Sequence, residues 1–501
     1  MTARPAKEPV NKALKDKPAG ICDECVAEGF PAFRDALGFF VLTNIAGKWL
    51  TVSRKDFDAL KAGKAKANSA LGKKLRERGM FPGRVDREAL VAAYREKNRH
   101  LFAGPNLHIV IVTLRCNQQC AYCHASRRRM DERRYDMTLD TARKVADTIF
   151  ETTSPSITIE FQGGEPVANW PALKFIVEYA QKKNATAGKQ LNFSLVTNLS
   201  LLDKAKTKFL LDNGVLLCTS LDGPADLHRA NRTFSGGDSY DDTIRRMERI
   251  NAEYKKRGYD TMLYHVDALM TTTRASLGRA RDIVDEYLSR GIKVLHLRPL
   301  NPMGFAQKTW QRIGYSDAEF LAFYRDTLDY VIERNLKGDE IQERMSAIFL
   351  TKILTERDPN FLDLRSPCGA GIGQLAYNHD GMIFTCDEGR MVHQMGDDIF
   401  ALGKAGETPY REIVSHETVK AIGVASCLDC LPRCAECAYR PYCGACPVVN
   451  YMEQGDIFGQ RARSSRCAIY IGVLDYLFRR LHKADKDVLN IFSKWVTFRQ
   501  R

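Results

Sequence analysis

Short apolar runs alternate with stretches of helical periodicity over the middle of the chain, beginning at Leu107. The apolar runs predict buried strands, and the stretches between them predict amphipathic helices. Strands that are apolar throughout and separated by helices indicate a parallel sheet covered by helices. The predicted strands are 107–114, 156–162, 191–197, 215–221, 263–270 and 293–297, and the predicted helices are 139–152, 172–183, 204–213, 240–257 and 277–290.

Six strand–helix units are too few for a closed barrel of eight units, but they suit a partial one. We therefore expect an α/β fold with a partial (β/α)6 barrel over residues 105–310. In such a barrel, ligands bind at the carboxyl ends of the strands. Any chemistry should thus come from the loops that follow the strands.

The segments on either side of the barrel differ from it in pattern. Two short strands around a turn at Gly47, followed by helices at 54–60 and 71–78, predict a small N-terminal α+β module that resembles a winged helix. After the barrel comes a stretch rich in Cys, Gly and Pro with little apolar periodicity, so we expect metal to supply its core. The predicted divisions are a mobile Lys- and Pro-rich segment 1–30, the module 31–100, the barrel 105–310, a helical connector 311–365 with helices at 316–335 and 342–355, the Cys-rich region 366–470 and a helical tail 471–501.

Length and composition agree with several domains. A chain of 501 residues exceeds one ordinary core, and 44% apolar with 27% charged residues is a usual globular composition. No apolar run approaches the roughly 18 residues that suggest a membrane span. The N-terminus has no apolar segment after its charges, so it does not predict a secretory signal. We expect a cytoplasmic protein that does not associate with membranes.

The net charge of +14 arises from 75 basic and 61 acidic residues, with a basic cluster at 127–129. Such a charge suits an acidic peptide, an anionic cofactor or a nucleic acid, but also a plain solvated face. No stacking-aromatic motif accompanies the basic residues, so nucleic-acid binding is not indicated.

Fifteen cysteines are more informative, because the cytoplasm keeps thiols reduced and disfavours a disulfide framework. Cys116, Cys120 and Cys123, spaced Cys-x3-Cys-x2-Cys, follow the first barrel strand. Thiolates suit zinc or iron–sulfur clusters, and three of them can hold a four-iron cluster whose fourth iron stays open. A zinc site would need a fourth ligand, for which only the adjacent His124 is at hand.

This spacing, with Tyr122 before the last cysteine, resembles the radical S-adenosylmethionine (radical SAM) superfamily. The resemblance implies that the open iron binds SAM, which is cleaved to a 5′-deoxyadenosyl radical that abstracts hydrogen from the substrate. Gly163-Gly164-Glu165-Pro166 matches the family motif that binds the SAM amino group, although alone it would read as a tight turn. Further SAM contacts are implied at the ends of later strands, where plain caps or structural roles are the alternative: Thr197, Asn198, Ser220, Asp222 and Arg298.

The second cysteine group resembles the SPASM domain, an extension of radical SAM peptide maturases and sulfatase-maturating enzymes that carries two auxiliary four-iron clusters. One departure is the two-residue spacing before Cys446, where three is usual. The resemblance assigns Cys434, Cys437, Cys443 and Cys467 to an outer cluster and Cys368, Cys386 and Cys446 to an inner one.

The inner cluster then lacks a fourth thiolate. Cys427 or Cys430 may complete it in this assignment, or its open iron receives a substrate atom. A zinc ribbon built from these two cysteines with Cys434 and Cys437 is a further alternative.

Other residues were weighed against structural roles. In the sulfatase-maturating relatives an aspartate directly after the matching cysteine is a base, which makes Asp387 the candidate proton acceptor. A carboxylate that accepts backbone hydrogen bonds in the cluster loop is the alternative. Cys22 and Cys25 could bind zinc or be incidental, and Cys218 fits a core strand.

From about Phe40 onward, stretches such as Glu-Phe-Gln-Gly-Gly-Glu-Pro and Arg-Ser-Pro-Cys-Gly resemble the radical SAM maturase of His-Xaa-Ser peptide systems. The resemblance implies a ribosomally synthesised precursor peptide as substrate, side-chain crosslinks such as cyclophanes as products, and a flavodoxin- or ferredoxin-like electron donor. Residues 39–100 would then recognise a leader peptide by strand addition, or else cap the barrel. Formylglycine-type oxidation of a Cys or Ser, and a non-catalytic iron–sulfur sensor, are the competing functions.

Overall fold

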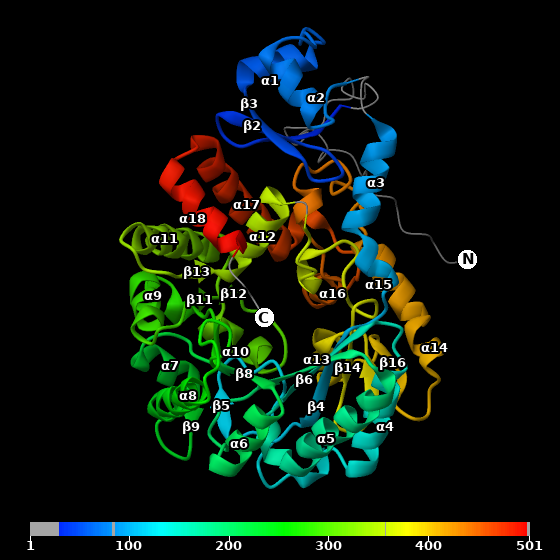
Figure 1. Ribbon diagram of the computed structural model, residues 1–501, viewed down its shortest axis with the longest axis vertical. Helices are drawn as coiled ribbons and strands as arrows, with labels where there is room; N and C mark the ends of the chain where they lie inside the picture. The colour runs from blue at the N-terminus through cyan, green and yellow to red at the C-terminus, as the bar shows by residue number, and fades with distance from the viewer. Residues whose placement is uncertain (1–29, 83–85, 356, 498–501) are drawn as a thin grey trace, which may run out of the picture.

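A nine-stranded sheet runs through the computed structural model, which describes residues 30–82, 86–355 and 357–497 (Figure 1). The Cys22–Cys25 pair and nearly all of the predicted mobile segment lie outside the described residues. The sheet order is β12-β10-β8-β7-β6-β4-β14-β15-β16. Its bounds are β4 (Leu107–Thr113), β6 (Ser156–Gly163), β7 (Gln190–Val196), β8 (Val215–Ser220), β10 (Asp267–Thr271), β12 (Leu297–Arg298), β14 (Gln374–Tyr377), β15 (Met382–Phe384) and β16 (Ala401–Lys404).

Strands β4, β6, β7, β8, β10 and β12 pair in parallel in their chain order. This arrangement confirms the α/β sheet, while closure into a partial barrel stays a prediction. Because the strands are parallel, the residues that follow each of them meet at one edge of the sheet. The helices between them are α4 (Leu139–Phe150), α5 (Trp170–Ala187), α6 (Lys204–Asp212), α7 (Ala225–Asn231), α8 (Ser239–Lys256), α9 (Ala280–Ser289) and α10 (Phe305–Ile313).

Two predicted strands differ from the observed ones. The fifth begins only at Asp267, because the residues before it form turns in which Tyr259 and Tyr264 pack at 4.7 Å between ring centroids. The sixth is interrupted at His296, so that β11 (Val294–Leu295) pairs with β13 (Gln342–Glu343) and β12 pairs with β10. Helices α7 and α10 were not predicted. Both are short, with 7 and 9 residues, and so carry little periodicity.

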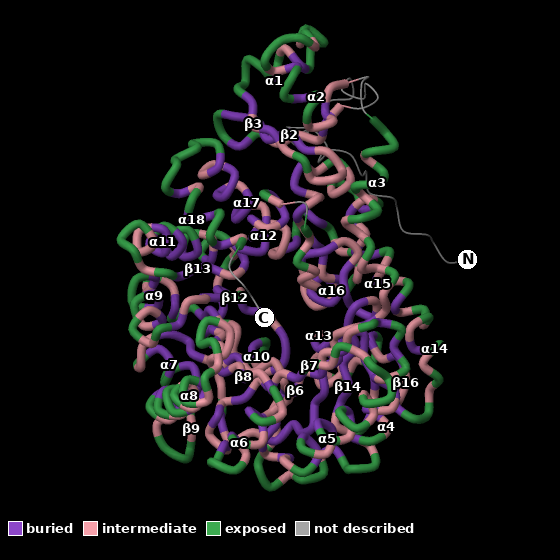
Figure 2. Tube along the Cα trace, in the orientation of Figure 1, coloured by how far each residue is buried: buried purple, intermediate pink, exposed green. Residues whose placement is uncertain are grey.

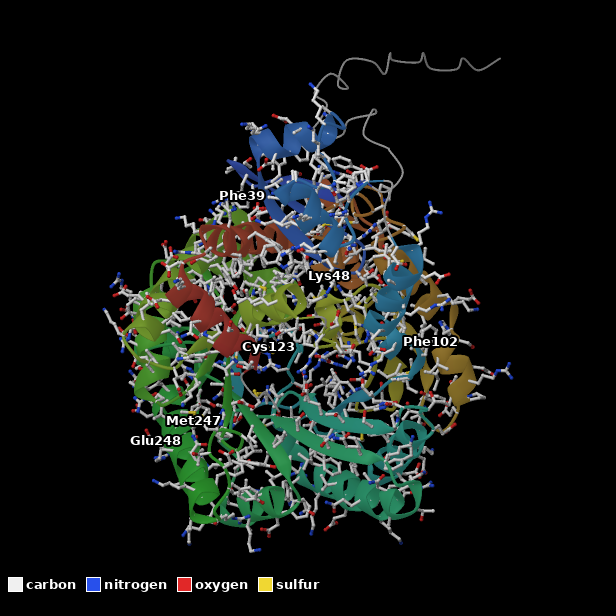
Figure 3. The ribbon with its side chains drawn as sticks, turned by 45° about the horizontal axis from the view of Figure 1, so that its top comes forward. Phe39, Lys48, Phe102, Cys123, Met247 and Glu248 are labelled. Carbon is white, nitrogen blue, oxygen red and sulfur yellow. The ribbon has the colours of Figure 1, made fainter. Side chains whose placement is uncertain are left out.

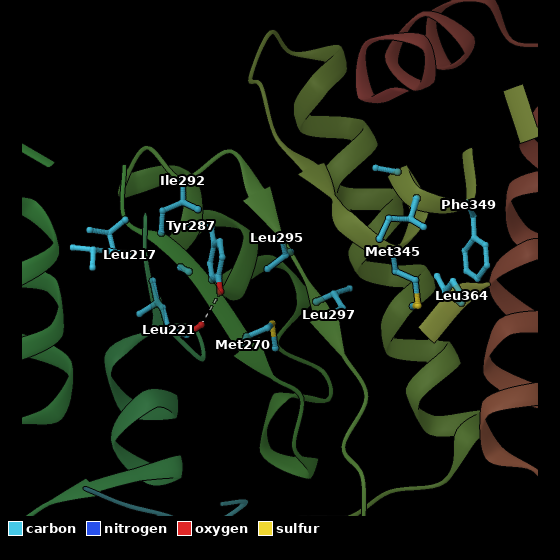
Figure 4. Close-up of a cluster of buried hydrophobic side chains, with 14 of the residues drawn as sticks. Leu217, Leu221, Met270, Tyr287, Ile292, Leu295, Leu297, Met345, Phe349 and Leu364 are labelled. Atoms are coloured by element: carbon cyan, nitrogen blue, oxygen red, sulfur yellow. Dashed lines mark hydrogen bonds between the residues drawn. The ribbon is translucent and has the colours of Figure 1, made fainter. Parts of the chain in front are cut away.

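The interior of the sheet is apolar, as the continuous strands predict. Figure 4 shows Leu217 and Met270 packing with Tyr287 from α9, and the core continues toward α12 (Arg344–Leu354) through Leu297. The Tyr287 hydroxyl donates to the carbonyl oxygen of Leu221 at 2.7 Å. Burying these side chains supplies the main stabilising free energy of the barrel.

The Cys-rich region has side-chain cores of its own, so the expectation that metal alone would supply its core is corrected. Strand β14 extends the main sheet beside β4, with β15 and β16 antiparallel beyond it. Ile109 and Ile111 from β4 pack with Ala376 and Phe384. Figure 2 shows this buried layer. The helices here are α13 (Asp387–His393), α14 (Tyr410–Val414), α15 (Glu417–Ser426) and α16 (Pro447–Gln454).

The N-terminal module is a three-stranded antiparallel sheet in the order β1-β2-β3 with helices packed on it. Phe40 and Phe57 stack in its core at 3.8 Å between ring centroids. Ser53 and Ser69 cap its first two helices. Its elements are β1 (Ala32–Asp35), β2 (Phe39–Thr43), β3 (Trp49–Ser53), α1 (Arg54–Lys61), α2 (Ala70–Glu77), α3 (Arg87–Lys97) and η1 (Arg99–Phe102).

Long helices join the module to the barrel. The Phe39 ring in the module stacks on His482 at 4.0 Å between ring centroids (Figure 3), and the Arg34 guanidinium makes a bidentate pair with Asp475 at 2.6 Å. The last part of the chain is therefore a packed helix that contains Cys467, rather than only a tail after residue 471. These helices are α11 (Asp317–Leu336), α12, α17 (Ser465–Lys483) and α18 (Lys486–Thr497), and the remaining short elements are β5 (Gln118–Cys120), β9 (Arg232–Phe234), η2 (Arg133–Tyr135), η3 (Pro166–Asn169), η4 (Arg274–Ser276), η5 (Leu362–Leu364), η6 (Arg440–Tyr442) and η7 (Arg461–Arg463).

No helix among the described residues is both long enough and apolar enough to cross a membrane.

Candidate active site

The loop after β4 holds Cys116, Cys120 and Cys123 at the carboxyl edge of the parallel strands. Its middle forms β5, which pairs antiparallel with β9. The Cys116 backbone N–H donates to the carbonyl of Arg128 at 3.0 Å, and the Phe305 N–H donates to the carbonyl of Cys123 at 2.9 Å. Figure 3 places Cys123 near the middle of the molecule. The three thiols are thus held on one anchored loop, as the spacing predicts.

Donor groups surround these sulfurs. The Gln118 backbone N–H lies 3.4 Å from the Cys116 sulfur, and the Arg232 guanidinium lies 3.7 Å from the Cys120 sulfur. Burial raises the pKa of the Cys116 thiol, and it raises that of the Cys120 thiol to about 11. Thiols in this setting stay protonated until a metal displaces the proton, and donors and a cation then stabilise the thiolates. The donor set therefore fits an anionic iron–sulfur cluster.

A zinc site at this loop gains no support. The His124 ring pairs through Nε2 with the carbonyl oxygen of Asn301 at 3.0 Å. Burial and then the charge of Arg298 lower the pKa of His124 to about 4. Among residues 30–82, 86–355 and 357–497, no three His, Cys, Asp or Glu side chains are grouped as a single metal ion would require.

Gly163 and Gly164 are needed for a reason that differs from the expected one. A Cβ on Gly163 would lie 2.3 Å from the carbonyl oxygen of Thr113, and one on Gly164 would lie 2.3 Å from that of Arg115. Gly163 also has φ of +135°, which L side chains rarely adopt. The glycines therefore let the end of β6 pack against the start of the cysteine loop.

Glu165 is fully buried behind that loop and links two strand ends. Its carboxylate accepts from the Thr197 hydroxyl at 2.7 Å and from the Asn198 backbone N–H at 2.8 Å. Burial raises the pKa of this carboxyl, and its hydrogen bonds oppose the shift. Such a buried carboxylate could accept an ammonium group, as the motif implies. The structure thus brings Glu165, Thr197 and Asn198 together.

Asn198 also reaches the cysteine loop, because its side-chain amide donates to Asn117 Oδ1 at 2.9 Å. Ser220 ends β8 and is half-buried, and Arg298 ends β12 and is exposed. Both lie at the carboxyl edge, where a ligand would be reached. Their role as SAM contacts stays a prediction.

Asp222 is fully buried in a network that supports the loop. Its carboxylate accepts from the Tyr122 hydroxyl at 2.7 Å and from Arg232 Nε at 3.0 Å, and the same guanidinium contacts the Cys120 sulfur. Arg232 escaped the sequence analysis because it belongs to no motif. Its role appears only when β9 pairs with β5. A direct SAM contact by Asp222 stays a prediction, and the observed contacts favour a supporting role.

Asp387 is the first residue of α13, directly after Cys386. Its carboxylate accepts from Arg390 Nε at 2.7 Å, and both side chains are almost fully buried, with 8% and 1% exposed. Arg390 was also not identified from sequence. Any proton transfer to Asp387 would have to occur beside this cation.

The seven cysteines assigned to auxiliary clusters form two groups. Cys368 and Cys386 share a buried cluster against which Cys446 packs. Cys434 and Cys443 pack together elsewhere, and burial followed by the charges of Cys467, Cys437 and Cys434 raises the pKa of Cys443. The grouping agrees with the inner and outer ligand sets, whose metal content stays a prediction.

Cys427 and Cys430 lie beside each other in the turn after α15. Burial and the neighbouring Cys430 thiol raise the pKa of Cys427, and Cys430 is exposed. Since no single-ion group of donors occurs in the described ranges, the zinc-ribbon alternative also gains no support. Cys218 lies within β8, half-buried, as expected for a strand residue.

Residues 110–267 match the radical SAM superfamily. This chain carries a radical SAM domain. The matched residues include the cysteine loop and the strand ends up to Asp222, whereas Arg298 and the Cys-rich region lie beyond them. The expected resemblance to radical SAM maturases is thereby confirmed, and a four-iron cluster and SAM are the cofactors that this superfamily implies.

The radical SAM domain has relatives among maturases. The chain is 24% identical over 380 residues to a cysteine-type anaerobic sulfatase-maturating enzyme of Clostridium perfringens (strain 13 / Type A), covering 73% of this chain and 94% of that enzyme. It is 26% identical over 167 residues to the radical SAM cyclopropyl synthase TigE of Paramaledivibacter caminithermalis, covering 31% and 34%.

Solved structures share the fold. The sulfatase-maturating enzyme anSMEcpe with bound AdoMet has a TM-score of 0.61 at 20% identity, covering 78% of this chain and 98% of that one. Streptococcus suis SuiB bound to its precursor peptide SuiA has a TM-score of 0.53 at 14% identity, covering 87% and 98%. The radical SAM fold with a further Cys-rich region is therefore shared.

Proposed function

We propose that this protein is a radical SAM enzyme that modifies a ribosomally synthesised peptide, forming a side-chain crosslink such as a cyclophane bond. The observation that carries the proposal is the anchored three-cysteine loop with the buried Glu165 behind it, inside the matched residues. The bound cluster and SAM would supply a 5′-deoxyadenosyl radical. This chain's own residues would hold the cluster and orient SAM.

Three parts of the chain have assigned tasks in this proposal. Cys116, Cys120 and Cys123 hold the cluster, and Arg232 stabilises the thiolate of Cys120. Glu165, with Gly163 and Gly164 packed beside it, binds the SAM ammonium together with Thr197 and Asn198, while Ser220, Asp222 and Arg298 complete the SAM contacts. The Cys-rich region holds two auxiliary four-iron clusters, with Cys427 or Cys430 as candidate fourth ligand of the inner one.

Asp387 is the proposed acceptor of the proton that the substrate releases when its C–H bond is oxidised. Its position directly after Cys386 supports this assignment. The peptide substrate is supported by SuiB, whose structure holds its precursor peptide, and a flavodoxin- or ferredoxin-like protein is the proposed electron donor. The N-terminal module, which presents the edge strands β1 and β3, would hold the peptide leader by strand addition.

The second candidate function is formylglycine-type oxidation of a Cys or Ser side chain. It is favoured by the 94% coverage of the sulfatase-maturating enzyme. A non-catalytic iron–sulfur sensor is less well supported, because Glu165 and its hydrogen-bonded neighbours form a site that a sensor would not need.

One experiment separates these functions. Reduced and reconstituted protein is incubated anaerobically with SAM and the peptide encoded beside it, and the product is analysed by mass spectrometry and a carbonyl-reactive hydrazide. A crosslink predicts loss of two hydrogens with no hydrazide adduct. A hydrazide adduct would instead support formylglycine formation. Absence of 5′-deoxyadenosine from the reaction would contradict both enzyme functions and favour the sensor.

A further inference from the structure

A cavity lies where three distant parts of the chain meet, away from the cysteine loop after β4. Its walls come from the end of α3 and η1, from α12, and from loops of the Cys-rich region, and it encloses about 410 Å³ of empty space. The N-terminal module, the helical connector and the Cys-rich region all contribute to it. Nothing in the proposed function uses this cavity.

The walls carry more basic than acidic groups. Four basic side chains, Lys97, Lys352, Arg365 and Arg440, face two carboxylates. Lys352 lies 3.4 Å from Asp358, and Arg440 lies 3.3 Å from Asp429. Pairing each carboxylate with one cation leaves two basic side chains without an acidic partner in the cavity.

Two of the lining side chains have buried nitrogen atoms without a partner. Arg365 is 1% exposed, and its Nε donates to the carbonyl of Pro367 at 3.3 Å, but its Nη2 has no hydrogen-bond acceptor. The Nε2 atom of His100 is likewise buried without a partner. A buried polar group left without a partner costs free energy, so an unfilled donor in a native structure calls for an occupant.

The basic groups also oppose each other. Burial and then the charge of Lys352 lower the pKa of Lys97 to about 7. The Lys97 ammonium keeps one contact, to the carbonyl oxygen of Pro441 at 2.7 Å. An anion between these side chains would remove the repulsion and favour the charged lysine.

We propose that this cavity binds an oxyanion, either a phosphate group or a carboxylate. Guanidinium and ammonium groups are the usual protein partners of these anions, and charge-assisted hydrogen bonds to them are strong. A bound oxyanion would join α3 of the N-terminal module to Arg365 and Arg440 of the Cys-rich region. The site would thus couple the position of the module to the loops that carry the auxiliary cysteines.

The test uses the full chain and inorganic phosphate as the probe, followed by isothermal titration calorimetry without SAM. We expect saturable binding by the unaltered protein and at least about tenfold weaker binding by Lys97→Met and by Lys352→Met. The control is Lys208→Met on α6, whose side chain is 71% exposed and lies outside the cavity. It should bind phosphate as the unaltered protein does.

Thermal unfolding provides a second readout, because phosphate should raise the melting temperature of the unaltered protein and of Lys208→Met but not of Lys97→Met. This comparison remains decisive if Lys352→Met fails to fold. Repeating the titration with N-acetylglutamate amide distinguishes the source of the anion: binding of both probes indicates a site for peptide carboxylates, and binding of phosphate alone indicates a phosphate site. Absence of saturable binding of either probe at millimolar concentration, or unchanged affinity in Lys97→Met, would overturn the proposal.

Discussion

Close contacts of single residues determine the shape of the loop that holds Cys116, Cys120 and Cys123. Gly164 touches the backbone of that loop, and Gly304 lies against it from the other side, where a Cβ would meet the carbonyl oxygen of His124 at 2.5 Å. These contacts leave no room for side chains. The loop is therefore shaped before any cluster binds.

Substituting Gly164 with Ala should disrupt this loop. The new Cβ would lie 2.3 Å and 2.4 Å from the carbonyl oxygens of Arg115 and Leu114, which belong to the backbone and cannot move aside cheaply. We expect iron per chain after reconstitution to fall severalfold. The control Gly423→Ala in α15 meets nothing within 4 Å and should retain iron, with stability unchanged or raised by up to about 1 kcal/mol. Full iron content in Gly164→Ala would contradict the packing role.

The role of Asp387 can be separated from its ion pair. Asp387→Asn leaves the buried Arg390 without its carboxylate, which should cost about 3–5 kcal/mol of unfolding free energy. The double variant Asp387→Asn, Arg390→Met removes both charges and should regain most of that stability. If Asp387 is the base, the double variant still cleaves SAM but forms no product, as mass spectrometry would show.

Product formation by the double variant at the original rate would remove Asp387 from the mechanism and leave it a structural residue.

The motif residues were found from sequence because their spacing is local: Cys116 to Cys123 and Gly163 to Glu165 lie within single loops. Arg232 and Arg390 were not found. Each acts through a partner brought close by folding, and a lone arginine carries no spacing of its own. Asp222 was found as a strand-end residue, but sequence could not show that Tyr122 and Arg232 occupy its carboxylate.

At the scale of elements, β4 connects the barrel to the Cys-rich region. It pairs with β6 on one side and with β14 on the other, so one strand positions both the cysteine loop and the region that follows. His108 of β4 is fully buried, and its Nδ1 lies 3.2 Å from the Tyr377 hydroxyl of β14. This contact crosses the junction.

Acid should weaken that junction. Burial lowers the pKa of His108 to about 3 in the folded protein, below the value of about 6.5 expected when unfolded. The stability tied to the neutral ring is therefore present above pH 6.5 and is lost as pH falls toward 3. Between pH 7 and pH 5 the loss should be about 2 kcal/mol, and His108→Phe should lack it.

Urea unfolding of both proteins at the two pH values checks this difference. An equal loss of stability in His108→Phe would show that the buried histidine does not carry the acid sensitivity.

Most barrel elements could be predicted because apolar strands and amphipathic helices leave a periodic signal. Strands β14, β15 and β16 could not, since each has only three or four residues and sits among Cys, Gly and Pro. The pairing of β14 with β4 spans more than two hundred residues of chain, and nothing local in the sequence specifies it.

At the scale of the whole molecule, the N-terminal module rests on α17, the same helix that supplies Cys467. Asp475 of α17 receives both nitrogens of the Arg34 guanidinium and the Tyr439 hydroxyl at 2.7 Å. Trp49 donates from its indole to the carbonyl of Ile353 on α12 at 2.9 Å. The module is therefore attached to the Cys-rich region and the connector together.

Loss of the Asp475 carboxylate should loosen the module. Asp475→Asn weakens a bidentate pair that is 31% and 15% exposed, so we expect about 1–3 kcal/mol less protection for the amides of β1 to β3 in hydrogen exchange. The control Asp35→Asn breaks an exposed pair with Arg54, 60% and 45% exposed, and should change little. Equal protection in Asp475→Asn and the unaltered protein would contradict the attachment.

The central claim is that the loop after β4 holds a four-iron cluster with one iron open to SAM. Its most direct test is the electron paramagnetic resonance spectrum of the reduced, anaerobically reconstituted protein before and after SAM is added. We predict a cluster signal that shifts when SAM binds, and loss of that shift in Cys123→Ala with the auxiliary signals retained. Protein that holds no iron, or a spectrum unchanged by SAM, would contradict the account.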